Sequence, residues 1–330
     1  MTTPVKIGTR RSLLATTQAE QVAAMVRDRL GRDTELVEIT TEGDRSQASG
    51  ASLVGLSATG VFVNALREAL LDGRIDVAVH SLKDLPTYPA DGISLVAVPP
   101  REDPRDAVVA RDGLTLGELP SGSRVGTGSP RRQAQLHALG LGLDVVPVRG
   151  NVDTRIGKVR SGEYDALVLA RAGLARIDRL DEITEVLDPL QMLSAPGQGA
   201  LGVECRAGDE LETGLARLDD PRSRSAVAAE RAVLATLEAG CSAPVGALAE
   251  VVEGEDGDEI WVRAVALSPD GSLSVRMSAT GDPADAVGVG TRLAEEMIAD
   301  GADSLVEARG RNGGDPNDHG DLAAELRGQR

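Results

Sequence analysis

The amino-acid sequence predicts an α/β fold in which two lobes face each other across a cleft, followed by a small α+β domain. In the first two-thirds of the chain, short apolar runs alternate with helical patterns, which is typical of sheets with largely parallel strands. Two segments, residues 99–110 and 193–205, are expected to cross between the lobes and so to leave a cleft between them. After residues 219–226 the pattern changes to a helix and the alternating strands of an antiparallel sheet.

The first lobe is expected to begin with the strand VKIGT and a helix from about Ser12 to Leu30. Ser12 is a suitable N-cap, and Gly31 can adopt the left-handed conformation that closes a helix. Three further apolar runs predict strands of this lobe, namely ELVEITT, IDVAVHS and ISLVAVP.

The second lobe is expected to contain the strands SRVGTG, LDVVPVRG and DALVLAR, each leading towards a helix. Ser129 as N-cap and Pro130 as first helical residue fit the start of one of these helices. In the C-terminal domain, ERAVLATLEAG predicts a helix that ends at Gly240, and another helix is expected near residues 284–300. Between them, strands are predicted for VGALAEVV, IWVRAVALS and LSVRMSAT, with a PDGS turn joining the last two.

The composition argues against several kinds of protein. A length of 330 residues favours two or three domains. A formal net charge of −17 and an aromatic content of 1% disfavour nucleic-acid binding, which depends on basic patches and stacking platforms. No apolar run is long enough to span a bilayer or to direct export, so we expect a cytoplasmic protein. Two cysteines do not make a disulfide framework, and the widely spaced histidines do not indicate a metal site.

Arginines gather where predicted strands end and helices begin. Arginine binds carboxylate or phosphate bidentately, and ligands of open parallel sheets bind beyond the carboxyl ends of the strands. A single such position could be structural, but four at one sheet edge favour a pocket for a small polyanion. The positions are Arg10 and Arg11 after the first strand, Arg131 and Arg132 after SRVGTG, Arg149 and Arg155 after DVVPV, and Arg171 and Arg176 after DALVLA.

The segment VAVHSLKDLP is the strongest candidate for acid–base chemistry, because Lys83 and Asp84 follow a strand end. The two could form a surface ion pair worth ~0–1 kcal/mol. Alternatively, Asp84 could be a carboxylate in a cationic cleft, where it would stay ionised and stabilise a developing cation. His80 could act as a base, although a histidine that ends an apolar strand is more often buried.

The two cysteines lie in different contexts. Cys205 in ALGVEC reads as a core residue, whereas Cys241 lies in a loop of small residues, EAGCSAPVG, that can present a thiol. From these residues alone, a buried structural cysteine is the simpler interpretation of Cys241 as well.

Together these segments resemble the porphobilinogen deaminase, or hydroxymethylbilane synthase, family. The match runs from about residue 5 to residue 250 through TRRS, VHSLKDLP, REDPRDA, VGTGSPRRQAQL, VRGNVDTR, APGQGALGVEC and EAGCSAPVG. The resemblance implies two periplasmic-binding-protein-like lobes and a small α+β C-terminal domain with a three-stranded antiparallel sheet. The implied division is domain 1 in residues 1–99 and 199–218, domain 2 in 104–194, domain 3 in 222–308, and a polar, mobile tail in 309–330.

The resemblance also implies a transferase of tetrapyrrole biosynthesis. Such an enzyme joins four porphobilinogen molecules, with loss of ammonia, onto a covalently bound dipyrromethane primer and releases the linear tetrapyrrole hydroxymethylbilane. Each pyrrole carries an acetate and a propionate, which the arginines would bind. The implied partner is the small-molecule substrate, with no nucleic acid and no membrane, and the implied state is a monomer.

By the same resemblance, Asp84 would be the catalytic residue that binds pyrrole N–H groups, stabilises the cationic azafulvene and assists proton transfer. Cys241 would carry the dipyrromethane cofactor through a thioether, and no metal is implied. The substrate- and cofactor-binding positions would be Arg10, Ser12, Ser81, Lys83, Thr127, Ser129, Arg131, Arg132, Arg149, Arg155, Arg176 and Gln198.

The chain departs from the family pattern at two places. Ala58 and Thr59 stand where many members have a lysine, and the stretch from Arg45 to Gly60, which we expect to be a mobile lid, contains no lysine. Leu13 replaces a frequent proline, for which we expect only a small effect on the helix start.

Two alternatives stay open from the sequence. Phe62 could pack over a pyrrole or could be an ordinary core residue. A two-lobed binding protein or a ligand-sensing domain would also explain the arginines. The binding protein would leave Cys241 in a third domain unexplained, and the sensing domain would need a DNA-binding module that the sequence does not show.

Overall fold

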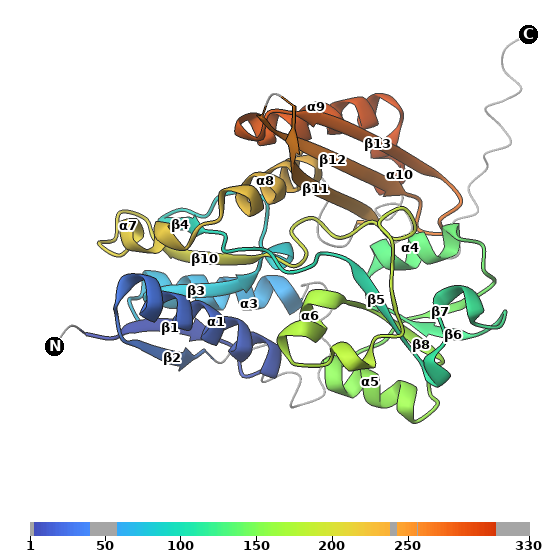
Figure 1. Cartoon of the computed structure of the whole chain (residues 1–330), viewed down its shortest axis with the longest axis horizontal. Coiled ribbons are helices and arrows are strands. Elements are labelled where there is room, and N and C mark those ends of the chain that lie inside the picture. Colours follow the sequence, from blue (N-terminus) through green and yellow to red (C-terminus); the bar gives the residue numbers. More distant parts are fainter. Residues whose placement is uncertain (1–2, 40–57, 238–242, 256, 308–330) are drawn as a thin grey trace, which may run out of the picture.

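The computed structural model describes residues 3–39, 58–237, 243–255 and 257–307. Two α/β lobes lie side by side, and the C-terminal domain lies across them (Figure 1). The expected fold class of two lobes and an antiparallel C-terminal sheet is confirmed.

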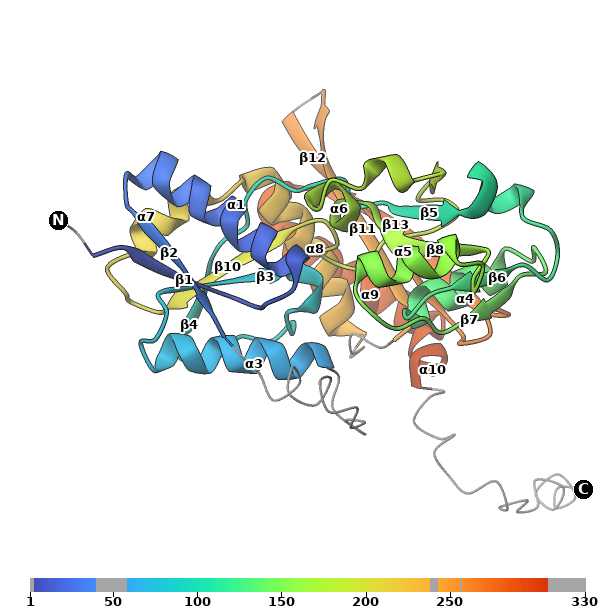
Figure 2. The ribbon, with the colours of Figure 1, turned by 90° about the horizontal axis from the view of Figure 1, so that it is seen from below.

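The first lobe is built on the sheet β2-β1-β3-β10-β4. Helices α1 and α3 cover its opposite faces, as Figure 2 shows from below. The predicted first helix is confirmed, since Ser12 caps it and Gly31 ends it with a φ of 65°. The elements are β1 (Val5–Thr9), α1 (Leu13–Leu30), β2 (Thr34–Glu38), α3 (Ala58–Leu71), β3 (Val77–Ser81), β4 (Ile93–Ala97), β10 (Leu201–Arg206) and α7 (Glu212–Leu215).

The second lobe is built on the sheet β7-β6-β8-β5-β9. Its core lies on both faces of β5 and β8, where Val108 packs towards α4 and Leu169 towards α5. Ser129 and Pro130 start α4 as predicted. The elements are β5 (Asp106–Ala110), β6 (Arg124–Gly126), α4 (Pro130–Ala138), β7 (Asp144–Val146), α5 (Val152–Arg160), β8 (Ala166–Ala170), α6 (Arg171–Arg176) and β9 (Glu185–Val186).

The expectation of largely parallel strands is wrong for the strands that follow the two crossings. β10 runs antiparallel to β3 and β4, and β5 runs antiparallel to β8 and β9. The reason is geometric. β1 and β3 end at the boundary between the lobes, whereas β5 and β10 begin there, because each is the first strand after the chain has crossed from the other lobe.

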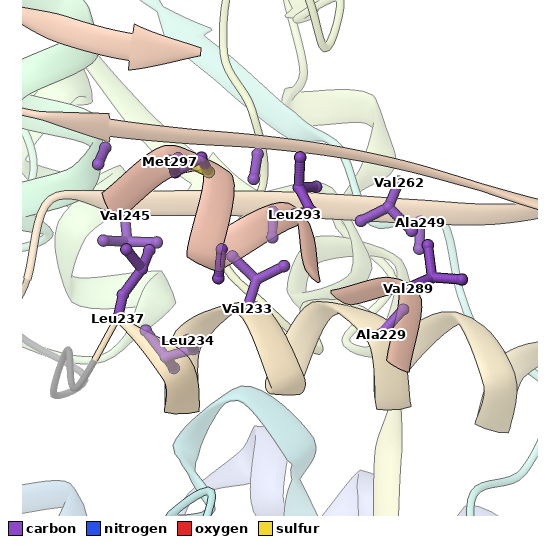
Figure 3. Close-up of a cluster of buried hydrophobic side chains, with 14 of the residues drawn as sticks. Ala229, Val233, Leu234, Leu237, Val245, Ala249, Val262, Val289, Leu293 and Met297 are labelled. Carbon is purple, nitrogen blue, oxygen red and sulfur yellow. The ribbon is translucent and has the colours of Figure 1, made fainter. Parts of the chain in front are cut away.

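The C-terminal domain packs helices α8 and α9 against the antiparallel sheet β11-β12-β13. Figure 3 shows its core, in which Val233 of α8 and Leu237, the residue just after α8, meet Leu293 and Met297 of α9 beneath the strands. The helix predicted for ERAVLATLEAG starts earlier than expected, at Pro221 with Asp220 as its cap, and the structure describes it as far as Thr236. Its predicted end at Gly240 lies outside the described residues. The elements are α8 (Pro221–Thr236), β11 (Val245–Gly254), β12 (Gly257–Leu267), β13 (Ser274–Gly281), α9 (Ala286–Ala299) and α10 (Ala302–Glu307).

Helix α8 also ties the C-terminal domain to both crossings. The buried carboxylate of Glu230 accepts two hydrogen bonds from Arg101 in the first crossing, at 2.7 and 3.0 Å. It also accepts from the backbone N–H of Gly197 in the second crossing at 2.6 Å, and from that of Ala249 in β11 at 2.8 Å. A buried carboxylate needs such donors, so this junction fixes the two crossings against the third domain.

Candidate active site

A cavity of ≈160 Å³ lies where the two lobes meet. α1 and the 3₁₀ turn after β3 (Leu82–Asp84) contribute its wall from the first lobe, and α4, α5 and α6 contribute the wall from the second. Among the described residues that line the cavity, the polar and charged ones are Gln18, Ser81, Lys83, Asp84, Arg132, Arg155 and Arg176. Four cations therefore face a single carboxyl group.

The carboxyl end of β3 delivers three predicted residues to this cavity. Ser81 ends the strand, and the 3₁₀ turn then carries Lys83 and Asp84 inward. Nε2 of Gln18, from the buried face of α1, donates to Oγ of Ser81 at 2.8 Å. Gln18 was not predicted as a site residue, because its position on an amphipathic helix resembles any core-facing polar residue.

For both Asp84 and Lys83, burial shifts the pKa in one direction and the neighbouring opposite charges shift it in the other. Burial raises the pKa of Asp84, although the positive charges of Lys83, Arg10 and His80 act in the other direction. Burial and the nearby Arg132 lower the pKa of Lys83 to about 8, against the effect of Asp84 and Asp106. The cleft thus holds an acid and an amine whose pKa values have both moved towards neutrality, which suits proton transfer.

Arg131 and Arg132 share one internal carboxylate that the sequence did not reveal. Asp106, fully buried at the start of β5, accepts from Nη2 of Arg131 and from Nη2 of Arg132, both at 2.7 Å. Burial raises the pKa of Asp106, but the two guanidinium groups outweigh it and hold the pKa well below its usual range. Arg132 lines the cavity, whereas Arg131 lies behind it and donates to the carbonyl oxygen of Leu193.

Gln198 connects the two lobes at the second crossing. Its amide nitrogen donates to Oδ1 of Asp106 at 2.8 Å, and its amide oxygen accepts from Nζ of Lys83 at 3.3 Å and from Nη2 of Arg132 at 3.5 Å. The next residue, Gly199, has a φ of +86°, and a Cβ there would lie 2.3 Å from the carbonyl oxygen of Glu102. Only glycine fits this close approach of the two crossings.

The remaining predicted arginines divide by position. Arg155 and Arg176 line the cavity, and burial lowers the pKa of each. Nη2 of Arg176 donates to the carbonyl oxygen of Gly199 at 2.6 Å, and Nε of Arg155 donates to that of Gly150 at 2.7 Å. Arg149 is exposed and is not among the described residues that line the cavity.

Arg10 and Ser12 lie at the carboxyl end of β1. The guanidinium carbon of Arg10 lies 3.3 Å from the ring centroid of Phe62, which is buried near the start of α3. Phe62 is therefore a core residue on one side and a platform for Arg10 on the other. Oγ of Ser12 accepts from the backbone N–H of Ala15 as the cap of α1.

Thr127 and Ser129 shape the start of α4 rather than the described cavity wall. Oγ1 of Thr127 accepts from the backbone N–H of Ser129 at 3.2 Å, and Oγ of Ser129 accepts from that of Arg132 at 3.5 Å. Cys241 lies outside the described residues, as do most of the expected lid in residues 45–60 and the tail in 309–330.

Cys205 and His80 are buried titratable residues that are not among the described residues lining the cavity. Cys205 is fully buried in the first lobe, where burial and the nearby Glu212 raise the pKa of its thiol to about 11. His80 is buried, as a histidine ending an apolar strand was expected to be, and lies against Glu204.

The structure shows no cluster of potential metal ligands within its described ranges, and none of the helices it describes is long and apolar enough to cross a membrane.

Comparison with known families gives a match over most of the chain. Residues 5–213 match the family described as porphobilinogen deaminase, dipyromethane cofactor binding domain. Residues 225–299 match the family described as porphobilinogen deaminase, C-terminal domain. The two matches are separated by residues 214–224, a stretch that includes the first turn of α8.

Similar proteins extend over nearly the same length. The porphobilinogen deaminase of Mycobacterium tuberculosis H37Rv is 59% identical over 311 residues, covering 92% of this chain and 98% of that protein. The porphobilinogen deaminase of Mycobacterium marinum is 57% identical over 317 residues, covering 93% of this chain and 98% of that protein.

The likeness to solved structures is more distant. A periplasmic substrate-binding protein of an ABC transporter from Coxiella burnetii has a TM-score of 0.41 and 13% identity, covering 65% of this chain and 91% of that protein. The methionine-binding protein MetQ has a TM-score of 0.39 and 15% identity, covering 65% of this chain and 89% of that protein.

Proposed function

The chain belongs to the porphobilinogen deaminase family, and on this premise we propose how its residues share the work. Its activity is that of a hydroxymethylbilane synthase, a transferase of tetrapyrrole biosynthesis that joins four porphobilinogen molecules with loss of ammonia and releases the linear tetrapyrrole. Its cofactor is a dipyrromethane, because the family domain that matches residues 5–213 is the one that binds this cofactor.

The first proposal is that the cavity between the lobes binds the carboxylates of cofactor and substrate. The observation that carries it is the excess of cations around the cavity, where Asp84 is the one carboxyl group among the described lining residues and Lys83, Arg155 and Arg176 add to Arg132, which is already paired with Asp106. The lowered pKa values of Lys83, Arg155 and Arg176 mark positive charges that lack full solvation. Carboxylates entering the cavity would supply the missing negative charge, so these residues fit a polycarboxylate group.

The second proposal is that Cys241 carries the dipyrromethane through a thioether. The support is the family resemblance of EAGCSAPVG and the position of Cys241 shortly after α8, which is tied to both crossings through Glu230. The other cysteine, Cys205, is fully buried, and its raised thiol pKa disfavours the thiolate that a covalent attachment needs.

The third proposal assigns the acid–base and electrostatic work to Asp84. When bound, the dipyrromethane supplies the pyrrole α-carbon that attacks the incoming unit. Asp84 would bind pyrrole N–H groups, give a proton to the departing amine, and stabilise the cationic azafulvene as a carboxylate. Its raised pKa suits a group that must both donate and accept a proton. Lys83 and Arg10 would hold substrate carboxylates beside it.

Several further points rest on the family resemblance. We propose the division into domain 1 (1–99 and 199–218), domain 2 (104–194) and domain 3 (222–308). We also propose that the enzyme acts as a cytoplasmic monomer whose partner is porphobilinogen, without nucleic acid or membrane.

The decisive experiment combines intact mass with a colour reaction. Purified protein should exceed its sequence mass by two linked pyrrole units, and acidic dimethylaminobenzaldehyde should reveal the dipyrromethane. The adduct should map to the peptide that contains Cys241 and should persist in Cys205→Ser. An unmodified Cys241 in fully active protein would refute the attachment, and a purified protein that binds porphobilinogen without releasing ammonia would favour a binding protein instead.

A further inference from the structure

A buried chain of charged side chains runs behind the catalytic turn, on the side away from the cavity. Glu204 of β10 is 2% exposed and accepts from Nη2 of Arg67 at 2.6 Å and from Nε of the same residue at 3.1 Å. The oxygen that accepts from Nε of Arg67, Oε2, also lies 3.1 Å from Nε2 of His80. The order is therefore Arg67, Glu204, His80, with each side chain in contact with the next.

The fold links this chain of side chains to Asp84. His80 and Glu204 are diagonal neighbours on adjacent antiparallel strands, since Gly202 pairs with His80 and Glu204 pairs with Ala78. Both point to the face of the sheet that α3 covers, and Arg67 reaches them from α3. His80 is the last residue but one of β3, and Asp84 lies four residues later at the end of the 3₁₀ turn.

The carboxylate of Glu204 is held ionised in this interior. Burial raises the pKa of Glu204, but the neighbouring His80 and Arg67 outweigh burial and lower the pKa to about 2. A buried charge with two fixed partners holds both partners in place. Packing alone does not require this arrangement at a strand end whose other neighbours are apolar residues such as Leu82 and Val79.

We propose that His80 is a positioning residue for Asp84, held in place by Glu204 and, through Glu204, by Arg67. The inference rests on the proposed role of Asp84. The charged groups that face Asp84 are Lys83 of its own turn, Arg10 after β1 and His80 of β3, and each acts to lower the pKa of Asp84. Lys83 lines the cavity, where substrate carboxylates would compete for it, whereas His80 is buried against Glu204 and is not among the described residues that line the cavity.

The test is the pH profile of kcat/KM for His80→Gln, which keeps an amide donor for Glu204 but removes the imidazole. We expect kcat to fall about 10-fold, while KM stays within about twofold because the cleft arginines are untouched. The acid limb of the profile should move to higher pH, because a positive influence on Asp84 is lost. The dipyrromethane adduct should remain.

A second pair of variants protects the test against misfolding. Glu204→Gln should lower kcat in the same way, and the double variant with His80→Gln should lose no more than the worse single variant, because the residues act as one unit. Arg67→Lys keeps the charge but not the two-point contact, so it should show a smaller loss in the same direction. A strictly additive double variant would overturn the proposal.

The matched control is Arg206→Met. Arg206 ends β10, the strand that carries Glu204, and joins α3 to the turn before β3 through the carbonyl oxygens of Leu70 and Ile75 and the carboxylate of Asp76. Its loss should lower the melting temperature and leave the acid limb in place. An acid limb that is unchanged in His80→Gln, with Asp84→Asn inactive, would overturn this proposal alone. An active Asp84→Asn would instead overturn the role of Asp84 and, with it, this proposal.

Discussion

The guanidinium group of Arg10 lies against the ring of Phe62, with its central carbon 3.3 Å from the ring centroid. These two residues come from different elements, the turn after β1 and the first part of α3. The contact holds a long side chain at the edge of the lobe interface before any ligand arrives, and such preorganisation reduces the entropy lost on binding. Phe62 is the single phenylalanine of the chain, so this platform has a specific sequence origin.

Phe62→Leu should therefore weaken substrate binding without removing a charge. A cation–π contact contributes about 0.5–2 kcal/mol, which corresponds to roughly a 2- to 30-fold rise in KM, with little change in kcat. Steady-state kinetics with porphobilinogen measure this directly. Leu66→Met, a core change on the same helix, is the control and should keep the wild-type KM. A rise in KM of equal size in both variants would show that the effect comes from repacking of α3.

Asp84→Asn should separate catalysis from folding. The change preserves size but removes the carboxylate that would stabilise the azafulvene and exchange a proton, so we expect kcat to fall ~10²-fold or more. The protein should keep its melting temperature or gain slightly, because the charged form of a partly buried carboxyl is disfavoured there. The adduct at Cys241 should survive in the intact mass. Near-normal turnover would reduce Asp84 to the ion-pair partner of Lys83 that the sequence also allowed.

The local features of the fold were predictable from sequence because their causes are local. Ser12, Gly31, Ser129 and Pro130 each act within one helical turn, and all four take the predicted positions. The direction of β10 was not predictable in this way. It depends on which end of the sheet the chain enters after crossing from the other lobe.

The site shows the same division between local and distant causes. The position of Lys83 and Asp84 follows from a strand end, and the structure places both in the cleft. The pairing of Asp106 with Arg131 and Arg132 joins residues 25 and 26 positions apart, and REDPRDA reads as surface charge. One signal in the sequence could have revealed this pairing. Asp106 opens the apolar run DAVVA, and an aspartate in a buried strand is almost always paired with a positive charge.

Lys83 should give the unliganded enzyme a characteristic pH dependence. Its pKa is about 8 in the folded protein and 10.5 in an unperturbed chain, so between these values the unfolded chain binds more protons. Stability should therefore rise as pH increases from about 8 to 10.5, since the cost of burying the charged amine disappears. The measurement is the difference in melting temperature between apoenzyme and Lys83→Met, both prepared without porphobilinogen, across this range. A difference that stays constant with pH would contradict a desolvated amine at this position.

Asp106→Asn should destabilise the protein more than any change on the cavity surface. The substitution leaves two buried guanidinium groups without their carboxylate, and removal of one partner from a buried ion pair costs about 3–5 kcal/mol. Because the pKa of Asp106 is held far below its usual range, the stabilisation is present above the ordinary aspartate pKa and is lost only as pH falls towards the lowered value. Denaturant unfolding at neutral pH measures the cost. Asp103→Asn, on a partly exposed neighbour paired with Arg105, is the control and should cost far less.

The cleft arginines should divide between building the primer and extending the chain. Loss of one charge-assisted contact costs about 1.5–3 kcal/mol, enough to stall a product that must move after each addition. Some substitutions to methionine among Arg131, Arg132, Arg149 and Arg155 should prevent primer assembly and leave protein of unmodified mass. In contrast, Arg10→Met and Arg176→Met should retain the primer and accumulate partly extended forms.

The measurement for this division is the ladder of intact masses after a limiting amount of porphobilinogen. Arg11→Met is the matched control, because Arg11 follows the same strand as Arg10 but is exposed and paired with Glu38. It should give the wild-type ladder. The four arginines differ in their surroundings. Arg132 and Arg155 line the cavity, whereas Arg131 donates its hydrogen bonds to Asp106 and to the carbonyl oxygen of Leu193. Arg149 is exposed. If the block in primer assembly comes from direct contact with carboxylates, Arg132 and Arg155 should show it in protein of normal stability, and Arg131 should show it together with a lowered melting temperature. Identical ladders and rates in every variant would mean that the cleft binds its ligands through summed charge, without assigned positions.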